Sequence, residues 1–202
     1  MIVACLDLEG VLVPEIWIAF AEKTGIEKLR LTTRDIPDYN KLMQGRLDIL
    51  NENNLTLSDI QEVIKDISPF PGAKEFLSWL KSEFQVIILS DTFNQFAGPL
   101  MAQLDYPPLF CHDLIIDEAG KIKDFQLRIP DAKTKAVKAL QGLNFKVIAA
   151  GDSYNDTGML KQANAGILFR APNNVIKEFP QFPVTLDYDG FKKLFIETAK
   201  KL

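Results

Sequence analysis

Cysteines and long apolar segments are scarce in this sequence. Its only two cysteines, Cys5 and Cys111, show neither the spacing of metal ligands nor the density of a secreted disulfide scaffold. We therefore interpret both as packing thiols in a reducing compartment. No apolar run approaches the ~20 residues of a membrane span, and residues 2–6 are too short for the apolar part of a signal peptide. The sequence predicts a soluble, cytoplasmic protein that does not act on a membrane.

An excess of positive charge is also absent. The 202 residues include 23 Lys and Arg against 27 Asp and Glu, which gives a formal net charge of −4. The basic residues are scattered along the chain, so we expect no nucleic-acid partner. His112 is the only histidine, and its surroundings in the sequence give no reason for a catalytic role. Whether the chain forms a homodimer is left open.

The pattern that is present is typical of an α/β fold. Short apolar runs rich in β-branched residues alternate with longer helical patterns, which predicts a Rossmann-like core with a parallel sheet and helices on both faces. The expected strands are residues 2–6, 85–89, 146–150 and 166–169. The first three run directly into polar clusters. Because ligands bind beyond the carboxyl ends of such strands, these clusters are expected to share one site.

A small helical cap is expected after the first strand. The segment between the first two strands is far longer than the ~10 to 12 residues of a minimal crossover. Helical patterns within it cover residues 16–20, 39–53 and 58–67, and Ser58 and Gln61 have the spacing of a capping box. We place the cap at residues 14–71 and the core at 1–13 and 72–202. A β-hairpin is expected from residues 114–117 and 122–127, near a sheet edge.

Acidic residues follow two of the expected strands. Asp7 and Glu9 come after the first, and Asp152 and Asp156 come after the strand at 146–150. Each alone is more often a turn residue or a helix N-cap than a catalytic group. Together they would repel one another, and a divalent cation relieves that repulsion. Hard oxygen ligands in a small site favour Mg²⁺.

The joint order of the polar motifs resembles the haloacid-dehalogenase-like superfamily. That family shows Asp-x-Asp-Gly after strand one, Ser or Thr after strand two, a Lys, and Gly-Asp-x-x-x-Asp. The corresponding motifs here are Asp7-x-Glu9-Gly10, Ser90, Lys133 and Gly151-Asp152-x-x-Asn155-Asp156. The resemblance covers nearly the whole chain and implies phosphate-ester chemistry on a Rossmann-like core.

The resemblance implies a role for each catalytic residue. Asp7 would be the nucleophile that carries the phosphoryl group, and Glu9 the general acid and base. Ser90 and Lys133 would hold the phosphate. One departure is that the second acid is Glu9, where the family usually has Asp, so the carboxyl reaches one methylene further.

The same resemblance implies a metal site. Asp152 would bind Mg²⁺ together with Asp7 and the backbone carbonyl of Glu9. Asp156 would either bind the metal or orient its ligands.

Within the superfamily the chain is most similar to phosphoserine phosphatases. The local matches are Val13-Pro14-Glu15, Met43-Gln44-Gly45-Arg46-Leu47 and Pro71-Gly72-Ala73. The similarity implies that Glu15 holds the substrate amine, Arg46 its carboxylate, and Asn155 another part of the substrate. Read alone, Arg46 is equally a solvated helix residue and Glu15 a helix N-terminal residue.

A second departure points to a subgroup. Phosphoserine phosphatases usually have Ser-Gly-Gly where this chain has Ser90-Asp91-Thr92, so Asp91 is expected beside the phosphate. With Glu9, this closely resembles the bifunctional phosphoserine phosphatase and homoserine phosphotransferase group, which implies phosphoserine and homoserine as substrates and a place in serine and threonine biosynthesis. Two alternatives stay open: a phosphatase of another small ester, such as a sugar phosphate, and a phosphorylation-driven signalling module.

Overall fold

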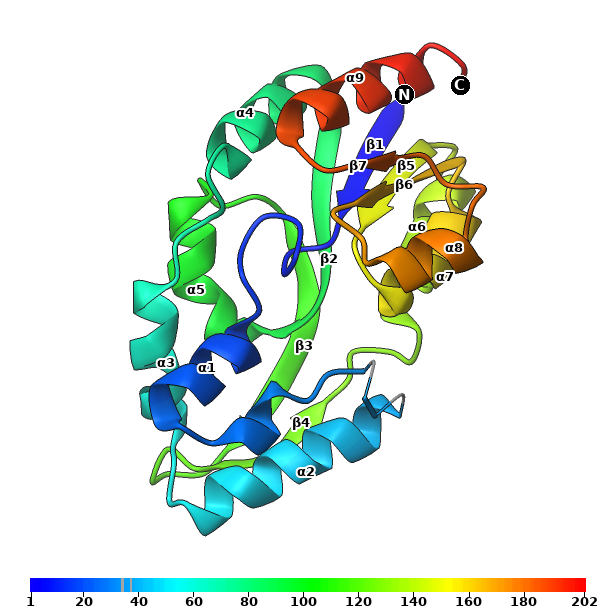
Figure 1. Cartoon of the computed structure of the whole chain (residues 1–202). Helices are drawn as coiled ribbons and strands as arrows, with labels where there is room; N and C mark the ends of the chain where they lie inside the picture. The colour runs from blue at the N-terminus through cyan, green and yellow to red at the C-terminus, as the bar shows by residue number, and fades with distance from the viewer. Residues whose placement is uncertain (34, 37) are drawn as a thin grey trace.

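A seven-stranded sheet forms the centre of the computed structural model, which describes residues 1–33, 35–36 and 38–202 (Figure 1). The strand order is β4-β3-β2-β1-β5-β6-β7, and every neighbouring pair is parallel except β3 and β4. The strands are β1 (Ile2–Leu6), β2 (Gln85–Phe93), β3 (Leu109–Ile116), β4 (Ile122–Gln126), β5 (Lys146–Gly151), β6 (Ala165–Phe169) and β7 (Val184–Thr185). This mostly parallel sheet confirms the predicted α/β fold.

Helices cover both faces of the sheet. Alternate residues of β1 belong to different core clusters: Ala4 and Leu6 pack on one face, Val3 and Cys5 on the other. The first face is covered by α4 (Ala73–Glu83), α5 (Asn94–Gln103) and α9 (Tyr188–Ala199). The second is covered by α6 (Ala132–Gly142), α7 (Thr157–Gln162) and α8 (Asn173–Glu178). Burial on both sides explains why these strands read as continuous apolar runs.

Strand β2 is longer than the sequence suggested. We expected it to end at Leu89, but the strand continues to Phe93 and therefore includes Ser90, Asp91 and Thr92. Phe93 is buried and pairs with His112 of β3, which keeps this segment in the sheet despite its polar residues. Three polar residues in a row were read as a loop because sequence alone did not reveal the strand beside them.

The segment between β1 and α4 is helical, as expected. It contains α1 (Ile16–Thr24), the short 3-10 helix η1 (Glu27–Arg30), α2 (Tyr39–Glu52) and α3 (Leu57–Asp66). Its two connections to the core run side by side, joined by a hydrogen bond from Phe70 N–H to the Leu12 carbonyl at 2.9 Å. We retain residues 14–71 as the proposed cap. The capping box of α3 is made by Thr56 and Asp59, not by Ser58 and Gln61, because the helix begins two residues earlier than that pair requires.

The predicted hairpin is present and reaches the cap. Its first strand, β3, begins five residues before the expected start at 114. The hairpin packs against α2, where Tyr39 and Phe125 meet edge to face with ring centroids 6.1 Å apart. It also contacts the start of α3, where Leu57 N–H donates to the Gly120 carbonyl at 3.0 Å. The cap is thus supported by the hairpin as well as by its own connections (Figure 1).

Within the described part of the chain, no helix combines the length and the apolar character needed to cross a membrane.

Candidate active site

The carboxyl end of β1 is where the polar motifs meet. Since β1 lies between β2 and β5, the residues after these three strands are brought to one edge of the sheet. Asp7 directly follows β1, and its backbone N–H donates to the Ala150 carbonyl of β5 at 2.9 Å. Ser90 is buried in β2 close to the same point. The sheet order therefore accounts for the convergence that the sequence pattern predicted.

Lys133 is surrounded by carboxylates. Its Nζ lies 2.9 Å from Asp7, 2.8 Å from Asp156 and 3.3 Å from Asp91. Burial alone would lower the pKa of Lys133, but the charges of Asp156, Asp7 and Asp91 outweigh it and raise the pKa well above its usual value. This side chain is therefore a permanent positive charge beside the candidate nucleophile.

Asp7 carries a charge that its surroundings do not fully compensate. Its Oδ1 accepts from Leu8 N–H at 2.8 Å and contacts Lys133 at 2.9 Å, which leaves Oδ2 as the candidate attacking atom. Burial and the nearby charge of Asp156 raise the pKa of Asp7 well above its usual value, although Lys133 opposes them. One ammonium group is insufficient for this many acids, and an additional cation would complete the site.

Three of these acids are close enough to share a metal ion. One carboxylate oxygen from each of Asp7, Asp152 and Asp156 lies within 4.8 Å of the others, and all three residues are buried. Asp156 is oriented by the backbone, because its Oδ2 accepts from the N–H groups of Asp152 at 3.0 Å and Ser153 at 3.1 Å. Buried carboxylates of this kind can hold a divalent cation.

Gly10 is required by this arrangement. Its φ of +79° disfavours any side chain, and a Cβ at this position would lie 2.6 Å from the carboxylate atoms of Asp152. The backbone of the β1 loop can approach Asp152 this closely only because residue 10 is a glycine.

Glu9, in the loop that follows β1, is hydrogen-bonded to the start of α1. Its Oε2 accepts from Ile16 N–H at 2.8 Å, in the first turn of the helix. Burial, together with the neighbouring Glu15 charge, raises the pKa of Glu9 to about 8. A carboxyl with this pKa is mostly protonated at neutral pH and can donate a proton.

Arg46 is buried rather than solvated. Its guanidinium lies 4.6 Å from the centre of the Trp17 ring and donates to the Leu31 carbonyl at 2.8 Å. Burial lowers the pKa of Arg46 to about 10, so the group is still charged at neutral pH. Its Nε has no hydrogen-bond partner among the described residues. A buried donor left in this state is costly unless a ligand accepts from it.

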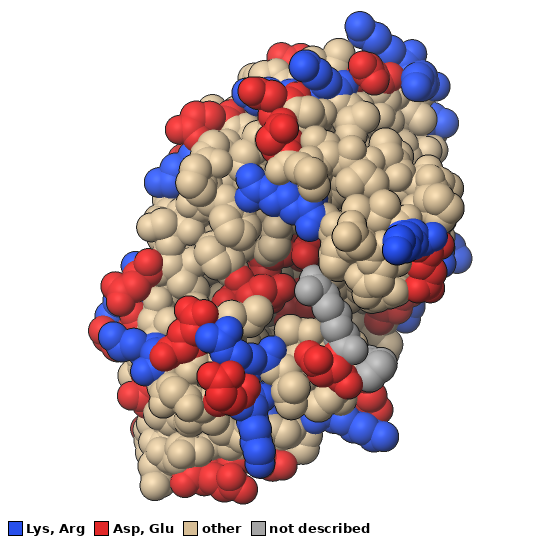
Figure 2. All heavy atoms as spheres, in the orientation of Figure 1, with Lys and Arg blue, Asp and Glu red and all other residues tan. Residues whose placement is uncertain are grey.

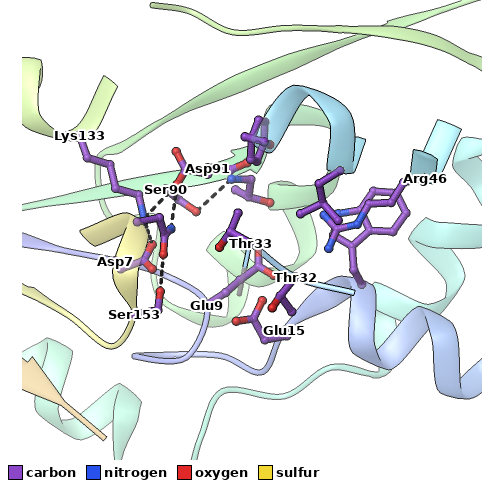
Figure 3. A pocket seen from close by; sticks show the side chains of 15 residues that line it. Asp7, Glu9, Glu15, Thr32, Thr33, Arg46, Ser90, Asp91, Lys133 and Ser153 are labelled. Carbon is purple, nitrogen blue, oxygen red and sulfur yellow. Dashed lines mark hydrogen bonds and ion pairs between the residues drawn. The ribbon is translucent and has the colours of Figure 1, made fainter. Parts of the chain in front are cut away.

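Most of these groups line one pocket between the proposed cap and the core (Figure 3). The pocket encloses about 90 Å³. Acidic side chains are visible at the floor of the hollow in Figure 2. The sequence-predicted residues in its lining are Asp7, Glu9, Glu15, Arg46, Ser90, Asp91, Lys133 and Asn155. Asp152 and Asp156 are outside the lining, in the carboxylate cluster with Asp7.

Several residues in the lining were not predicted. They are Trp17, Thr32, Thr33, Tyr39, Leu42, Thr92 and Ser153. Trp17 and Leu42 read as ordinary core positions of helices, so only the packing of the cap on the core reveals them. Ser153 could have been found from its place inside the motif between Asp152 and Asp156.

Asn155 and Asp91 form a contact that the sequence did not suggest. Asn155 Nδ2 donates to Asp91 Oδ2 at 2.9 Å, and Asp91 also faces His112 of β3, which is buried. His112 thus lies next to the site without lining the substrate pocket.

Comparison with known proteins yields a consistent set of relatives. Residues 3–164 match the family model described as haloacid dehalogenase-like hydrolase. The chain is 60% identical over 199 residues to a protein of Pseudomonas syringae pv. tomato named phosphoserine phosphatase, covering 98% of this chain and 84% of that protein. It is 59% identical over 201 residues to a Pseudomonas aeruginosa protein named phosphoserine phosphatase ThrH, covering 100% of this chain and 98% of that one.

Solved structures share the fold at lower sequence identity. A structure described as a phospho-aspartyl intermediate analogue of phosphoserine phosphatase superposes with a TM-score of 0.76 at 22% identity, covering 95% of this chain and 97% of that one. A substrate-bound phosphoserine phosphatase complex gives the same TM-score at 21% identity, with the same coverage.

Proposed function

Because this chain belongs to the haloacid dehalogenase-like hydrolases, we propose that it hydrolyses phosphoserine through a phosphoaspartyl intermediate on Asp7 and also transfers the phosphoryl group to homoserine. The names of its two relatives at 59% and 60% identity support the phosphoserine substrate. Conversion of serine phosphate and supply of phosphohomoserine would place the protein in serine and threonine biosynthesis.

The observation that carries the proposal is the distribution of charge in the pocket. Asp7 and Lys133 lie at one end and Arg46 at the other, with Glu15 between them beside Glu9 (Figure 3). Phosphoserine has a matching layout, with a phosphate at one end and an amine and a carboxylate at the other. A guanidinium with an unused Nε donor suits the carboxylate, and Glu15 suits the amine. A sugar phosphate offers no group for either charge.

In the first step the Asp7 carboxylate attacks phosphorus and the bond to the serine oxygen breaks. Lys133 offsets the negative charge that would otherwise keep the two anions apart, and Ser90 is placed to donate to a phosphate oxygen. Glu9, protonated at neutral pH, gives its proton to the departing oxygen. The products of this step are serine and phosphorylated Asp7.

In the second step an acceptor hydroxyl attacks the phosphorus of the phosphoaspartate, the bond from phosphorus to the Asp7 oxygen breaks, and the Asp7 carboxylate leaves. The ionised Glu9 takes the proton of the acceptor. Water as acceptor gives inorganic phosphate, and homoserine gives phosphohomoserine. Homoserine carries the same amine and carboxylate as serine, so Glu15 and Arg46 can hold it in the same way. Its one extra methylene brings the hydroxyl closer to phosphorus, and the longer Glu9 is the matching adjustment on the protein side.

We infer that the metal is Mg²⁺, held by Asp7, Asp152 and the Glu9 carbonyl, with Asp156 either a further ligand or a residue that orients the ligands. The buried carboxylates and the raised pKa of Asp7 fit a divalent cation with oxygen ligands. When bound, this ion would neutralise charge on the attacking carboxylate and on the phosphate oxygens.

The pKa of Glu9 predicts the pH dependence of the first step. Since Glu9 acts as an acid with a pKa of about 8, kcat/KM for phosphoserine is expected to fall as the pH rises above that value. The charge of Glu15 helps to raise this pKa, so Glu15→Gln is expected to move the alkaline limb to lower pH. The measurement is kcat/KM from pH 6 to about 10. An alkaline limb that stays in place in Glu15→Gln would assign it to another group.

The contacts of Arg46 predict a selective loss of phosphoserine use. Arg46→Ala removes a charge-assisted pair, so kcat/KM for phosphoserine is expected to fall about 10- to 100-fold. An aryl phosphate such as p-nitrophenyl phosphate has no carboxylate for Arg46, and its kcat/KM should fall by no more than about 3-fold.

Arg30→Ala is the matched control. Arg30 is also a cap residue, but it is partly exposed and pairs with Glu22 and Glu27 at the surface. Arg30→Ala should leave kcat/KM unchanged for both substrates. Equal losses of kcat/KM on both substrates in Arg46→Ala would show that Arg46 supports the cap rather than binding the substrate.

Rapid hydrolysis of sugar phosphates by the unaltered protein would favour that alternative substrate class.

A further inference from the structure

Asp91 lies in the wall between two cavities. Asp91, Lys133 and Asn155 line the substrate pocket and also a neighbouring cavity of about 550 Å³. Space on the far side of this wall means that packing alone does not hold the Asn155 side chain in place. Its orientation must be set by hydrogen bonds.

Those hydrogen bonds hold both ends of the Asn155 amide. Nδ2 donates to Asp91 Oδ2 at 2.9 Å, and Oδ1 accepts from the Ser153 hydroxyl. An amide nitrogen has two N–H groups, and Asp91 uses one of them. The other is left for a ligand in the pocket that Asn155 lines.

The buried ring of His112 faces Asp91. Arg128 N–H donates to His112 Nδ1 at 3.1 Å, so the neutral ring carries its hydrogen on Nε2, which faces Asp91 Oδ1 at 3.6 Å. Burial alone would raise the pKa of Asp91, but the charge of Lys133 and the contacts of His112 and Asn155 outweigh it and lower the pKa. Asp91 is therefore an ionised acceptor at neutral pH.

Loss of Asp91 would affect Asn155 more than Lys133. Lys133 has shorter contacts with Asp7 at 2.9 Å and Asp156 at 2.8 Å than with Asp91 at 3.3 Å, and these two remain when Asp91 is removed. Asn155, in contrast, would lose the acceptor that fixes its nitrogen.

We propose that Asp91 is a positioning residue that acts on the substrate through Asn155: it turns the remaining Asn155 N–H toward the bound phosphate group. This inference rests on the proposed function, because it needs a phosphate ester in the pocket. It assigns a role to the acidic residue that stands where phosphoserine phosphatases usually have glycine.

A double-mutant cycle tests this route. Asp91→Ala is expected to lower kcat/KM for phosphoserine about 10-fold, mostly through KM, because Asn155 contacts the substrate but takes no part in proton transfer. In an Asn155→Ala background, Asp91→Ala should change kcat/KM by less than about 2-fold, since the residue through which it acts is gone. Losses that multiply in the double variant would overturn the proposal.

Replacement of Asp91 by asparagine separates the effect of its hydrogen-bond acceptor from the effect of its charge. Asp91→Asn removes the charge but keeps an oxygen that can accept from Asn155, while its amide nitrogen faces His112 Nε2, so it is expected to recover part of the activity lost in Asp91→Ala. Asp91→Ser is too short to reach Asn155 and should behave like Asp91→Ala; it replaces that variant in the cycle if thermal unfolding shows Asp91→Ala to be poorly folded. Equal losses in Asp91→Asn and Asp91→Ala would overturn the proposal.

Repeating the cycle with p-nitrophenyl phosphate separates this inference from the proposed function. Asn155 is proposed to contact the phosphate, so the same non-additivity is expected with the aryl ester. Non-additivity with the aryl ester in a protein that does not hydrolyse phosphoserine would support the role of Asp91 and reject the phosphoserine substrate. Additive losses with both esters in a protein that hydrolyses phosphoserine rapidly would reject only the role of Asp91.

Discussion

Asp7→Asn is expected to lower kcat for phosphoserine by about 10⁴-fold or more, because the carboxamide has the shape of the carboxylate but cannot form the phosphoryl intermediate. The loss should be the same with phosphoserine and with an aryl phosphate, since both react at the same atom. The measurement is steady-state release of phosphate by the two proteins at saturating substrate.

Stability provides an independent check on Asp7→Asn. The raised pKa of Asp7 means that folding disfavours its charged form, so removal of the charge should leave the metal-free protein with a Tm at least as high as before. Asp105→Asn is the matched control, because Asp105 is exposed and pairs with Lys81 outside the pocket. An Asp7→Asn protein that retains kcat within about 10-fold would mean that another residue is the nucleophile.

Removal of the divalent cation is the second large effect that we expect. Excess chelator should reduce phosphoserine turnover to background, and added Mg²⁺ should restore it, because the carboxylates around Asp7 otherwise repel the phosphate. Asp152→Asn is expected to raise the Mg²⁺ concentration needed for half-maximal activity about 10-fold or more. The measurement is activity against Mg²⁺ concentration for each protein.

Asp105→Asn again serves as the control and should keep the Mg²⁺ dependence of the unaltered protein. Full activity in excess chelator would reject the metal site. A normal Mg²⁺ dependence in Asp152→Asn would place the metal on other ligands.

The parts of the fold that sequence predicts well are those with a local signal. β1 is an apolar run that ends at Leu6, directly before Asp7, and its bounds agree with the prediction because both faces of this strand are buried. The end of β2 was placed too early, since Ser90, Asp91 and Thr92 read as a loop, while the pairing of Phe93 with β3 keeps them in a strand. Strand length thus depended on a neighbour that sequence patterns do not show.

The N-terminal cap of α3 shows that a sequence pattern can also leave the register of a short motif undecided. Ser58 and Gln61 have the same spacing as Thr56 and Asp59, and both pairs precede an apolar pattern. The structure uses the second pair, because α3 begins at Leu57. A spacing rule identified the kind of cap correctly but could not choose between two registers.

In the candidate site, too, some features could be predicted from the sequence and others could not. The ends of the parallel strands were enough to predict that Asp7, Ser90 and Asp152 lie at one edge of the sheet, whereas Lys133, in the first turn of α6, was placed there only by the family resemblance. For Arg46 the sequence left two readings, and burial against Trp17 with an unused donor favours a ligand contact over a solvated side chain. The contact of Asp91 with Asn155 joins residues that are 64 positions apart and only appears in three dimensions.

The most direct test of the proposed mechanism is a pulse–chase experiment with phosphoserine labelled in its phosphate. The protein is mixed with the label, quenched within the first turnover and digested, and the labelled peptide is identified; a parallel sample receives saturating homoserine before the quench. We expect the label on Asp7 in the first sample and in phosphohomoserine in the second. Label on a different residue, or no labelled aspartate at all, would contradict the nucleophile, and inorganic phosphate as the only chased product would contradict the transfer to homoserine.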